Sequence, residues 1–306
     1  MYRIGIDLGG TNTVAGLVDE NGKIIDIKSK KTNLPTTLDR IVHNILVLTI
    51  QLLNSNGISR AQVASIGVGV PCTANVQTGW MEDADHLGFP GGPLRQQLQV
   101  ALQLPVAIGN DADCAAWGEY QAGAYDSDSF ILVTLGTGVG GGIILGGRLI
   151  TGVNNAAGEI GHMTIHMDGE PCGCGNNGCF EAYGSASALI RHAREATGEA
   201  ITEAKEVFDR AAAGEQVFVR LLDEYTTHLA VGLANLINIF GPAYVCIGGG
   251  VSLAGDALLQ PVREKTYARM FAKAARRKPQ IILAKLHNDA GILGAALLEP
   301  QKEENQ

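Results

Sequence analysis

The sequence predicts an α/β protein built from two lobes of related architecture. The chain has 306 residues, more than a single hydrophobic core usually serves. Short apolar runs typical of strands alternate with longer segments of helical periodicity. Both halves open in the same way, with an apolar run, a glycine-threonine turn and a second apolar run. Tyr2–Leu8 begins the first such unit and Phe130–Leu135 begins the second. This similarity predicts a duplicated fold.

The first half is expected to begin with a three-stranded antiparallel meander. Its strands are predicted at Tyr2–Leu8, Val14–Val18 and Lys23–Lys31, with turns at Gly9-Gly10 and Asn21-Gly22. Helices are predicted at Leu38–Leu53 and Pro93–Leu102, and further strands at Ala64–Val70 and Val106–Ile108. The first helix has apolar residues at helical spacing, namely Ile41, Ile45, Leu48 and Leu52.

The second half repeats the order of strand, turn and returning strand. Strands are predicted at Phe130–Leu135, Gly142–Ile150, Tyr244–Ile247 and Ile281–Lys285, the second being turned back through Gly146-Gly147. Helices are predicted at Ala112–Tyr120, Ala186–Ala196, Val217–Phe240 and Ala290–Leu298. The 40 glycines, about twice the usual share, predict many tight turns, some of them close to a ligand.

Composition excludes several kinds of partner. The net charge is −8 and the pI is about 5.4, whereas a nucleic-acid-binding protein normally presents a basic face. The one short basic run, Arg276-Arg277-Lys278, is interpreted as a solvated helix end. The longest apolar stretch, Leu229–Phe240, is too short to cross a bilayer and contains Asn235 and Asn238. With no leader pattern at the N-terminus, we expect a cytoplasmic protein without membrane contact.

The first glycine-rich segment is Asp7-Leu-Gly-Gly-Thr11, directly after the first strand. Glycines there let backbone N–H groups face an anion, which makes Gly9 and Gly10 candidates for phosphate binding. Asp7 at the strand end is suited to Mg²⁺, held through water. Taken alone, the segment is equally typical of an ordinary hairpin turn.

The second glycine-rich segment runs from Leu135 to Gly142 and includes Gly136, Thr137 and Gly138. It fits the G-x-G-x-x-G pattern, which raises a dinucleotide-binding dehydrogenase as an alternative. That fingerprint requires a helix directly after the glycines, whereas the following residues here predict a strand. No G-x-x-x-x-G-K-[ST] segment occurs, which excludes a P-loop enzyme.

Asn110 and Asp111 follow a buried strand and precede a predicted helix. A carboxylate held there can accept a hydroxyl proton during in-line phosphoryl transfer. For this motif alone, a structural helix cap is the commoner explanation.

Three cysteines are close together in the sequence. Cys172, Cys174 and Cys179, with His162 ten residues upstream, fit a tetrahedral Cys₃His zinc site. All four positions would be filled by protein, so the predicted zinc is structural. The nearby Glu159 and Glu181 are candidates for hydrogen bonds to vicinal hydroxyls. The other cysteines, Cys72, Cys114 and Cys246, are expected in the core.

These motifs together resemble the ROK family of sugar kinases. The matching segments are Asp7–Thr11, Gly109–Asp113, Leu135–Gly138, Gly158–His162, Cys172–Glu181 and Ile247–Val251, in the family's order. The resemblance implies an actin-like (ribonuclease H-like) ATPase fold, with two lobes and a cleft between them. It also implies a smaller N-terminal lobe of residues 1–111 plus 290–306, and a larger lobe of residues 112–289 that carries the zinc loop and the nucleotide-binding region.

The resemblance also implies roles for individual residues. Asp111 would be the base for a hexose hydroxyl, by default the 6-hydroxyl of glucose, with ATP as donor. Asn110, Glu159, His162 and Glu181 would bind sugar hydroxyls, and His162 would also bind zinc. Thr11 and Thr137 would line the phosphates, and Gly248, Gly249 and Gly250 would lie near the adenosine. Members of the family are usually dimers and sometimes tetramers.

The sugar remains open at this stage. Many glucokinase-like members have Pro-Gly where this chain has Pro71-Cys72, and a Trp-like segment where it has His86-Leu-Gly-Phe89. Kinases for fructose or mannose, allose, or an N-acetylhexosamine are therefore alternatives. A sugar-sensing repressor is disfavoured, because Asp7 already reaches the first turn and leaves no room for a preceding DNA-binding segment. A non-catalytic sugar-binding protein is disfavoured because Asp111 is present.

Overall fold

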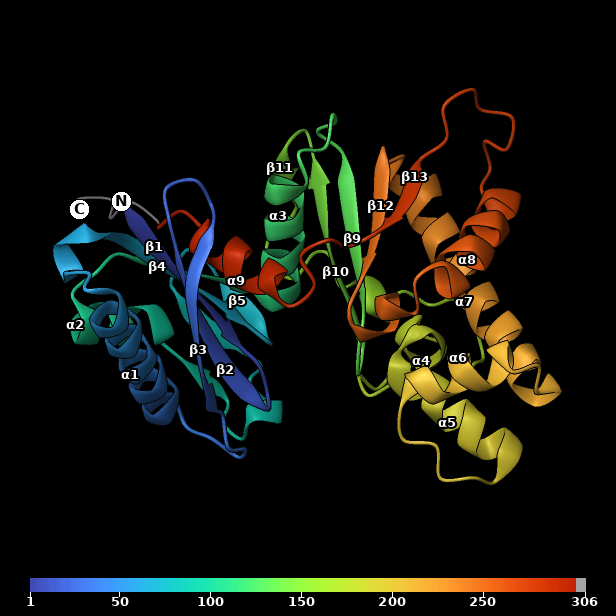
Figure 1. Ribbon diagram of the computed structural model, residues 1–306, viewed down its shortest axis with the longest axis horizontal. Coiled ribbons are helices and arrows are strands. Elements are labelled where there is room, and N and C mark those ends of the chain that lie inside the picture. The colour runs from blue at the N-terminus through green and yellow to red at the C-terminus, as the bar shows by residue number, and fades with distance from the viewer. Residues whose placement is uncertain (301–306) are drawn as a thin grey trace. The chain divides into compact units, whose positions relative to one another are not determined.

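The structure is a computed structural model, which describes residues 1–300 and, apart from His86, their side chains. The chain divides into two compact units (Figure 1). The first unit contains Met1–Tyr125, Leu149–Ala157 and the described residues from Asn288 on. The second contains Asp126–Arg148 and Gly158–His287.

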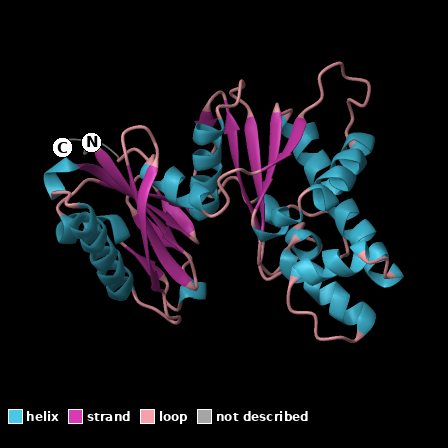
Figure 2. Cartoon of the chain, viewed as in Figure 1, coloured by secondary structure: helices cyan, strands magenta, loops and turns pink. Residues whose placement is uncertain are grey.

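Each unit combines one principal sheet with helices (Figure 2). In the first unit the strands are β1 (Tyr2–Leu8), β2 (Asn12–Val18), β3 (Ile24–Lys31), β4 (Val63–Val70), β5 (Thr73–Asn75), β6 (Trp80–Glu82), β7 (Gly91–Gly92) and β8 (Val106–Asn110). Its helices are α1 (Leu38–Asn56), α2 (Leu94–Leu102), α3 (Asp111–Gly123) and α9 (Asp289–Ala296).

The second unit has fewer strands than the first. Its strands are β9 (Phe130–Leu135), β10 (Val139–Leu145), β11 (Arg148–Leu149, the last residue of which is counted with the first unit), β12 (Tyr244–Gly248) and β13 (Gln280–Leu283). Its helices are α4 (Glu181–Gly184), α5 (Ala186–Thr197), α6 (Ala204–Ala212), α7 (Gln216–Phe240) and α8 (Asp256–Arg269).

The two principal sheets have the same strand order and directions. Among the described residues the first is β3-β2-β1-β4-β8 and the second is β11-β10-β9-β12-β13. In each, the first strand of the unit is central: it pairs antiparallel with the second strand on one side and parallel with β4 or β12 on the other. The duplication expected from the repeated strand-turn-strand pattern is thereby confirmed, and the two α/β units agree with the expected actin-like fold.

The two faces of the first sheet are packed differently. Isoleucines on one face of β1, such as Ile4 and Ile6, belong to a core shared with the apolar face of α1. The opposite face presents Gly5 and, from β4, Gly67, and there α9 lies directly on the strands (Figure 1). A Cβ at either glycine would collide with the α9 backbone. These glycines serve helix packing and not a turn or a ligand.

The expected lobe boundaries and the observed units differ in two places. Helix α3 lies with the first unit, because it packs tightly against α9: a Cβ at Gly118 or Gly294 would collide with the backbone of the partner helix. The segment Leu149–Ala157 also lies with the first unit, although it falls in the middle of the sequence.

Some elements escaped sequence reasoning. The small β5-β6-β7 sheet consists of strands two or three residues long, too short for a periodic pattern. Helix α8 contains Pro261, a residue that argues against helix in a sequence. The interpretation of Arg276-Arg277-Lys278 as a helix end is wrong, because α8 ends at Arg269 and the run lies in an exposed loop before β13.

Within residues 1–300, no helix is both long enough and apolar enough to cross a membrane.

Candidate active site

The two acidic candidates of the first unit, Asp7 and Asp111, lie at one edge of its sheet. Strands β1, β4 and β8 are parallel, and Asp7 is in register with Gly69, which is in register with Gly109. Gly109 is therefore two strands, or roughly 10 Å, from Asp7 by ordinary strand spacing. Asp111 follows Gly109 by two residues, so Asp7 and Asp111 stand at the same carboxyl edge of the sheet. Burial raises the pKa of Asp7, so a nearby cation would stabilise its charged form.

The turn between β1 and β2 is fixed by a threonine that sequence reasoning missed. The amide of Gly9 donates to the carbonyl of Asn12 at 3.0 Å, which closes the turn. Thr32 is fully buried, and its hydroxyl donates to the carbonyl of Gly9 at 2.6 Å while its amide donates to the carbonyl of Thr11 at 3.0 Å. Thr11 itself is exposed at the tip. A single Thr before the first helix carries no recognisable signal in the sequence.

Asn110, and not Asp111, is the cap of α3. The Asn110 side-chain oxygen accepts hydrogen bonds from the amides of Ala112 at 2.9 Å and Asp113 at 3.2 Å. Its amide group donates to the Cys72 carbonyl at 3.4 Å. Asp111 is the first helical residue, and one carboxylate oxygen accepts from the Ala112 amide at 2.8 Å. The N-terminus of a helix favours a negative charge at this position.

A small cavity adjoins this capped strand end. Its volume is about 150 Å³, and Asn110 and Asp113 line it together with Arg95 and Asn155. Arg95 donates to the carbonyls of Val76 and Gln77, and Asn155 donates to the Gln77 side chain at 3.0 Å. Through Asn155, the segment Leu149–Ala157 is thereby tied to the turn between β5 and β6 of its own unit.

Two glycine turns of the second unit lie at neighbouring strand ends. The turn Gly136–Gly138 follows β9, and Gly248–Gly250 follows β12, which pairs with β9 so that Gly248 stands opposite Thr134. Gly249 has a φ of 79°, and a Cβ there would meet the backbone of Leu135. Cβ atoms at Gly136 or Gly250 would meet no protein atom within 4 Å. Both turns therefore present open backbone on one side, as a bound phosphate or nucleoside requires.

The four predicted metal ligands converge. Ligand atoms of His162, Cys172, Cys174 and Cys179 all lie within 4.8 Å of one another. Nδ1 of His162 lies 3.7 Å from the Cys172 sulfur, and the sulfurs of Cys174 and Cys179 are 3.6 Å apart. The donor set, three sulfurs and one imidazole, is one that Zn²⁺ fills tetrahedrally.

The thiols of this cluster need a cation to ionise together. A hydrogen bond from the Asn176 amide lowers the pKa of Cys174 to about 7. Burial, together with the neighbouring Cys174 and Cys172 thiols, raises the pKa of Cys179 to about 12. Three thiolates this close repel one another, and a divalent ion removes that repulsion. The cluster therefore fits a metal, whereas Cys72, Cys114 and Cys246 are buried in the cores as expected.

Glu181 links the metal-ligand cluster to the Gly136–Gly138 turn. It is the first residue of α4, two positions after Cys179. One carboxylate oxygen accepts a hydrogen bond from the Val139 amide at 2.9 Å, and the other lies 3.7 Å from the Cys172 sulfur. Glu159 differs in being an exposed residue at the start of the 3₁₀ turn Ile160–His162.

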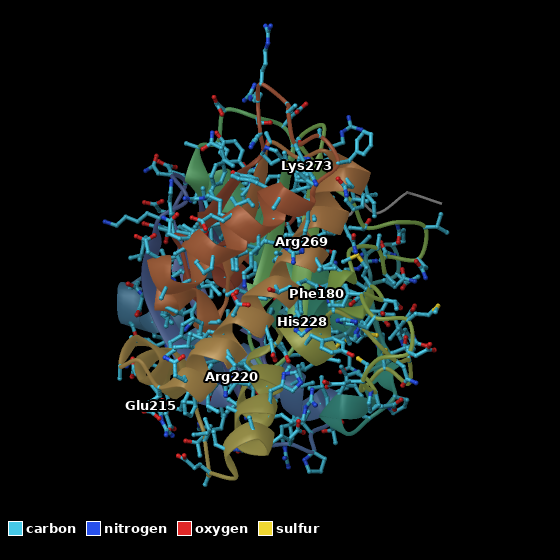
Figure 3. All side chains as sticks on the ribbon, turned by 90° about the vertical axis from the view of Figure 1, so that its right-hand side faces the viewer. Phe180, Glu215, Arg220, His228, Arg269 and Lys273 are labelled. Carbon is cyan, nitrogen blue, oxygen red and sulfur yellow. The ribbon has the colours of Figure 1, made fainter. Side chains whose placement is uncertain are left out.

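Aromatic side chains pack the cysteine-rich segment against the long helix α7. The Tyr183 hydroxyl accepts a hydrogen bond from the Glu170 amide at 2.7 Å, and its ring lies 4.8 Å from that of His228. Figure 3 labels His228 and the neighbouring Phe180, which is fully buried. A Cβ at Gly232 of α7 would come within 2.6 Å of the Phe180 ring. The segment is thus tightly seated on its helical support.

The larger cavity of the second unit is remote from these motifs. Its volume is about 730 Å³, and it is lined by residues that precede β9, β12 and β13, among them Ser129, Ala243 and Pro279. The glycine turns follow the same strands at their other ends. None of the predicted site residues lines it.

Comparison with known proteins agrees with this arrangement. The ROK family matches residues 3–302. A glucokinase of Halalkalibacterium halodurans is 35% identical over 99% of this chain and 96% of its own length. An N-acetylmannosamine kinase of Citrobacter koseri is 33% identical over 97% of this chain and 98% of its own.

A solved structure gives the same picture. It is a ROK family glucokinase of Streptomyces griseus in complex with glucose and AMPPNP, with a TM-score of 0.83 and 35% identity, covering 97% of this chain and 98% of that one. The repeated sheets, the carboxyl-edge polar residues, the Cys₃His cluster and the near-complete match lead to one conclusion: the chain belongs to the ROK family.

Proposed function

We propose that this ROK-family chain transfers the γ-phosphoryl group of ATP to a hexose, with the 6-hydroxyl of glucose as the first candidate acceptor. The observation that carries the proposal is Asp111, a carboxylate fixed at the end of a buried parallel strand in a chain 35% identical to a glucokinase. The glucose and AMPPNP in the similar structure support both substrates.

Asp111 is suited to the role of general base. One of its oxygens accepts a hydrogen bond from the Ala112 amide, which fixes the carboxylate at the start of α3, where a general base can accept a hydroxyl proton. Because phosphoryl transfer is mostly positioning and charge stabilisation, the base takes the proton as the bond to the leaving ADP breaks. Asn110 holds the start of α3 in place and thereby the base as well.

Sugar binding is assigned to four residues, Asn110, Glu159, His162 and Glu181. The His162 ring turns Nδ1 toward the cysteine cluster, which leaves Nε2 for a sugar hydroxyl. Glu159 is exposed and thus accessible to a ligand. Bound Zn²⁺ would neutralise the three thiolates and fix the loop that carries these side chains, without a part in the reaction.

Nucleotide binding is assigned to the glycine turns. Gly9, Gly10 and Thr11 in the first unit and Gly136, Thr137 and Gly138 in the second would line the phosphates. The amides of Gly9 and Gly136 close their own turns, so those of Gly10, Thr11, Thr137 and Gly138 would donate to the phosphates. Gly248, Gly249 and Gly250 would lie near the adenosine. Asp7 would hold Mg²⁺ through water, since its buried carboxylate gains from a nearby cation.

The acceptor is tested with a coupled assay of ADP release over a panel of sugars. Glucose, mannose, fructose, allose, N-acetylglucosamine and N-acetylmannosamine are compared at matched concentrations. We expect kcat/KM to be highest for glucose. A higher value for N-acetylmannosamine would assign the chain to the activity named for the Citrobacter koseri relative. No turnover with any sugar would refute the proposal.

A further inference from the structure

The turn Gly136–Gly138 is held at both ends by one short segment. At its end, the Val139 amide donates to the Glu181 carboxylate at 2.9 Å. At its start, the Gly136 carbonyl accepts from the Ala186 amide at 2.8 Å. Residues 181–186 thus clamp the turn from one side. The Gly136 amide also donates to the Gly138 carbonyl at 3.0 Å, which closes the turn on itself.

The two outer glycines of the turn have different surroundings. A Cβ at Gly138 would collide with the Glu181 carboxylate, whereas a Cβ at Gly136 would meet no protein atom within 4 Å. Gly138 is therefore required by Glu181, and Gly136 borders the open side. Since the amides of Gly136 and Val139 are already engaged, those of Thr137 and Gly138 remain to face a phosphate.

The clamping segment is anchored in turn by the metal-ligand cluster. It begins two residues after Cys179, and the second Glu181 oxygen lies 3.7 Å from the Cys172 sulfur. Phe180 between them is fully buried, and its amide donates to the Met163 carbonyl at 2.8 Å. A rigid path of covalent and hydrogen bonds thus leads from the cysteines to the turn.

We propose that Glu181 is a positioning residue for the phosphate-binding turn, so that the metal-bearing loop sets nucleotide affinity as well as sugar binding. The inference rests on the proposed function, because it takes the turn to bind nucleotide phosphates. It assigns the two oxygens of one carboxylate to different tasks. Oε2 fixes the turn through Val139, and Oε1, on the side of the cysteine cluster, is the atom assigned to a sugar hydroxyl.

The test is the affinity for Mg²⁺–AMPPNP, measured by calorimetry on zinc-replete protein without sugar. Glu181→Ala should weaken binding about three- to tenfold, the usual effect of one hydrogen bond. Glu181→Gln should stay within about twofold, because an amide oxygen can still accept from the Val139 amide. Glu159→Ala is the matched control: it removes the other candidate sugar carboxylate and should leave AMPPNP affinity unchanged. Zinc content is measured for each variant.

The outcomes separate this inference from the proposed function. Wild-type affinity for AMPPNP in Glu181→Ala, with sugar affinity lowered, would overturn the inference alone. An equal loss in Glu159→Ala would overturn it as well. Wild-type protein that binds sugar but not AMPPNP would refute the proposed function and the inference together.

A second measurement needs no ligand and covers the case in which Glu181→Ala is poorly folded. Gly138→Ala should lower the Tm, because the new methyl group displaces the Glu181 carboxylate, whereas Gly136→Ala should not. The double variant Gly138→Ala with Glu181→Gln should not restore the Tm, since Gln fills the same space as Glu. The double variant Gly138→Ala with Glu181→Ala should restore it. Additive effects of Gly138→Ala and Glu181→Ala would show that the two residues do not act on each other and would overturn the inference.

Discussion

The Glu181 carboxylate accepts a hydrogen bond from the backbone amide of Val139 at 2.9 Å. This contact joins two motifs that are 42 positions apart in the chain, the cysteine-rich segment and the second glycine turn. Each motif alone has an ordinary structural explanation, as a metal-stabilised loop or as a hairpin. Their direct contact is what the proposed site requires of them.

Replacement of the proposed base should separate binding from turnover. In Asp111→Asn, the side-chain oxygen can still accept from the Ala112 amide, so the start of α3 keeps its structure. We expect kcat to fall by roughly two to four orders of magnitude, the usual contribution of a general base, with sugar affinity nearly retained. Steady-state kinetics and calorimetry measure the two. Asp39→Asn, at an exposed position in the first turn of α1, is the control, and turnover of Asp111→Asn equal to that of this control would refute the assignment.

Loss of the metal should loosen the cysteine-rich segment. Purified protein is expected to hold about one zinc ion per chain, and Cys174→Ser should abolish most of it and lower the Tm. Cys72→Ala removes a cysteine outside the cluster and should leave the zinc content unchanged. Elemental analysis and thermal unfolding provide the readouts. Zinc-free wild-type protein, prepared without chelator, would contradict this prediction.

The charged Asp7 carboxylate is expected to lower the stability of the ligand-free protein. Burial raises its folded-state pKa above the usual 3.8, so the native state holds the proton more tightly than the unfolded state. Stability is therefore lost as the pH rises from 3.8 through the folded pKa, and at neutral pH the full penalty is present. Asp7→Asn should raise the Tm of ligand-free protein at pH 7.5, with a difference that shrinks on acidification.

The same substitution should weaken the use of magnesium. If Asp7 holds a water of hydrated Mg²⁺, Asp7→Asn should raise the Mg²⁺ concentration for half-maximal turnover by roughly tenfold or more, as loss of an outer-sphere partner does. Titration of Mg²⁺ in the ADP-release assay measures it. An unchanged Mg²⁺ requirement would remove Asp7 from the metal site, whatever its effect on the Tm.

His228 should make the protein acid-sensitive. Burial lowers the pKa of His228 to about 4 from the usual 6.5, helped by the nearby His166 and His192. The unfolded chain therefore takes up a proton first, and stability is lost as the pH falls from 6.5 toward 4. Nδ1 of His228 is buried without a hydrogen-bond partner, so His228→Phe removes a polar atom from an aromatic contact.

The expected result for His228→Phe is a higher Tm than wild type, with a larger difference at pH 5 than at pH 7.5. Thermal unfolding across that range measures it. The exposed His43 of α1 provides the control, since His43→Gln should leave the pH dependence unchanged. A pH profile of His228→Phe parallel to that of wild type would contradict the prediction.

Much of the fold could be predicted because its signals are local. The strand from Tyr2 to Leu8 is found as expected, and the helix predicted at Leu38–Leu53 extends only to Asn56. Periodicity and glycine turns mark such elements within a few residues. The small β5-β6-β7 sheet has no such signal, because two- or three-residue strands are specified by their neighbours and not by their own pattern.

The glycines show where sequence reasoning reaches its limit. Their number predicts turns and ligand contacts, and Gly9 and Gly136 do lie in turns. Gly5 and Gly67 instead make room for α9, which arrives from the other end of the chain. In a sequence, a glycine required because a distant helix leaves no space for a Cβ looks the same as a glycine beside open space.

The sequence by itself determined the fold class, the repeated order of strands and the set of candidate site residues, since each depends on residue type and spacing. The meeting of His162 with the three cysteines could also be expected, because all four lie within one short segment. Only the tertiary structure decided which partner each polar atom has. It showed that Asn110 caps α3, that the Thr32 hydroxyl holds the first glycine turn and that Glu181 accepts a hydrogen bond from Val139. Hydrogen bonds depend on positions within a few tenths of an ångström, and these are set by packing between segments far apart in the chain.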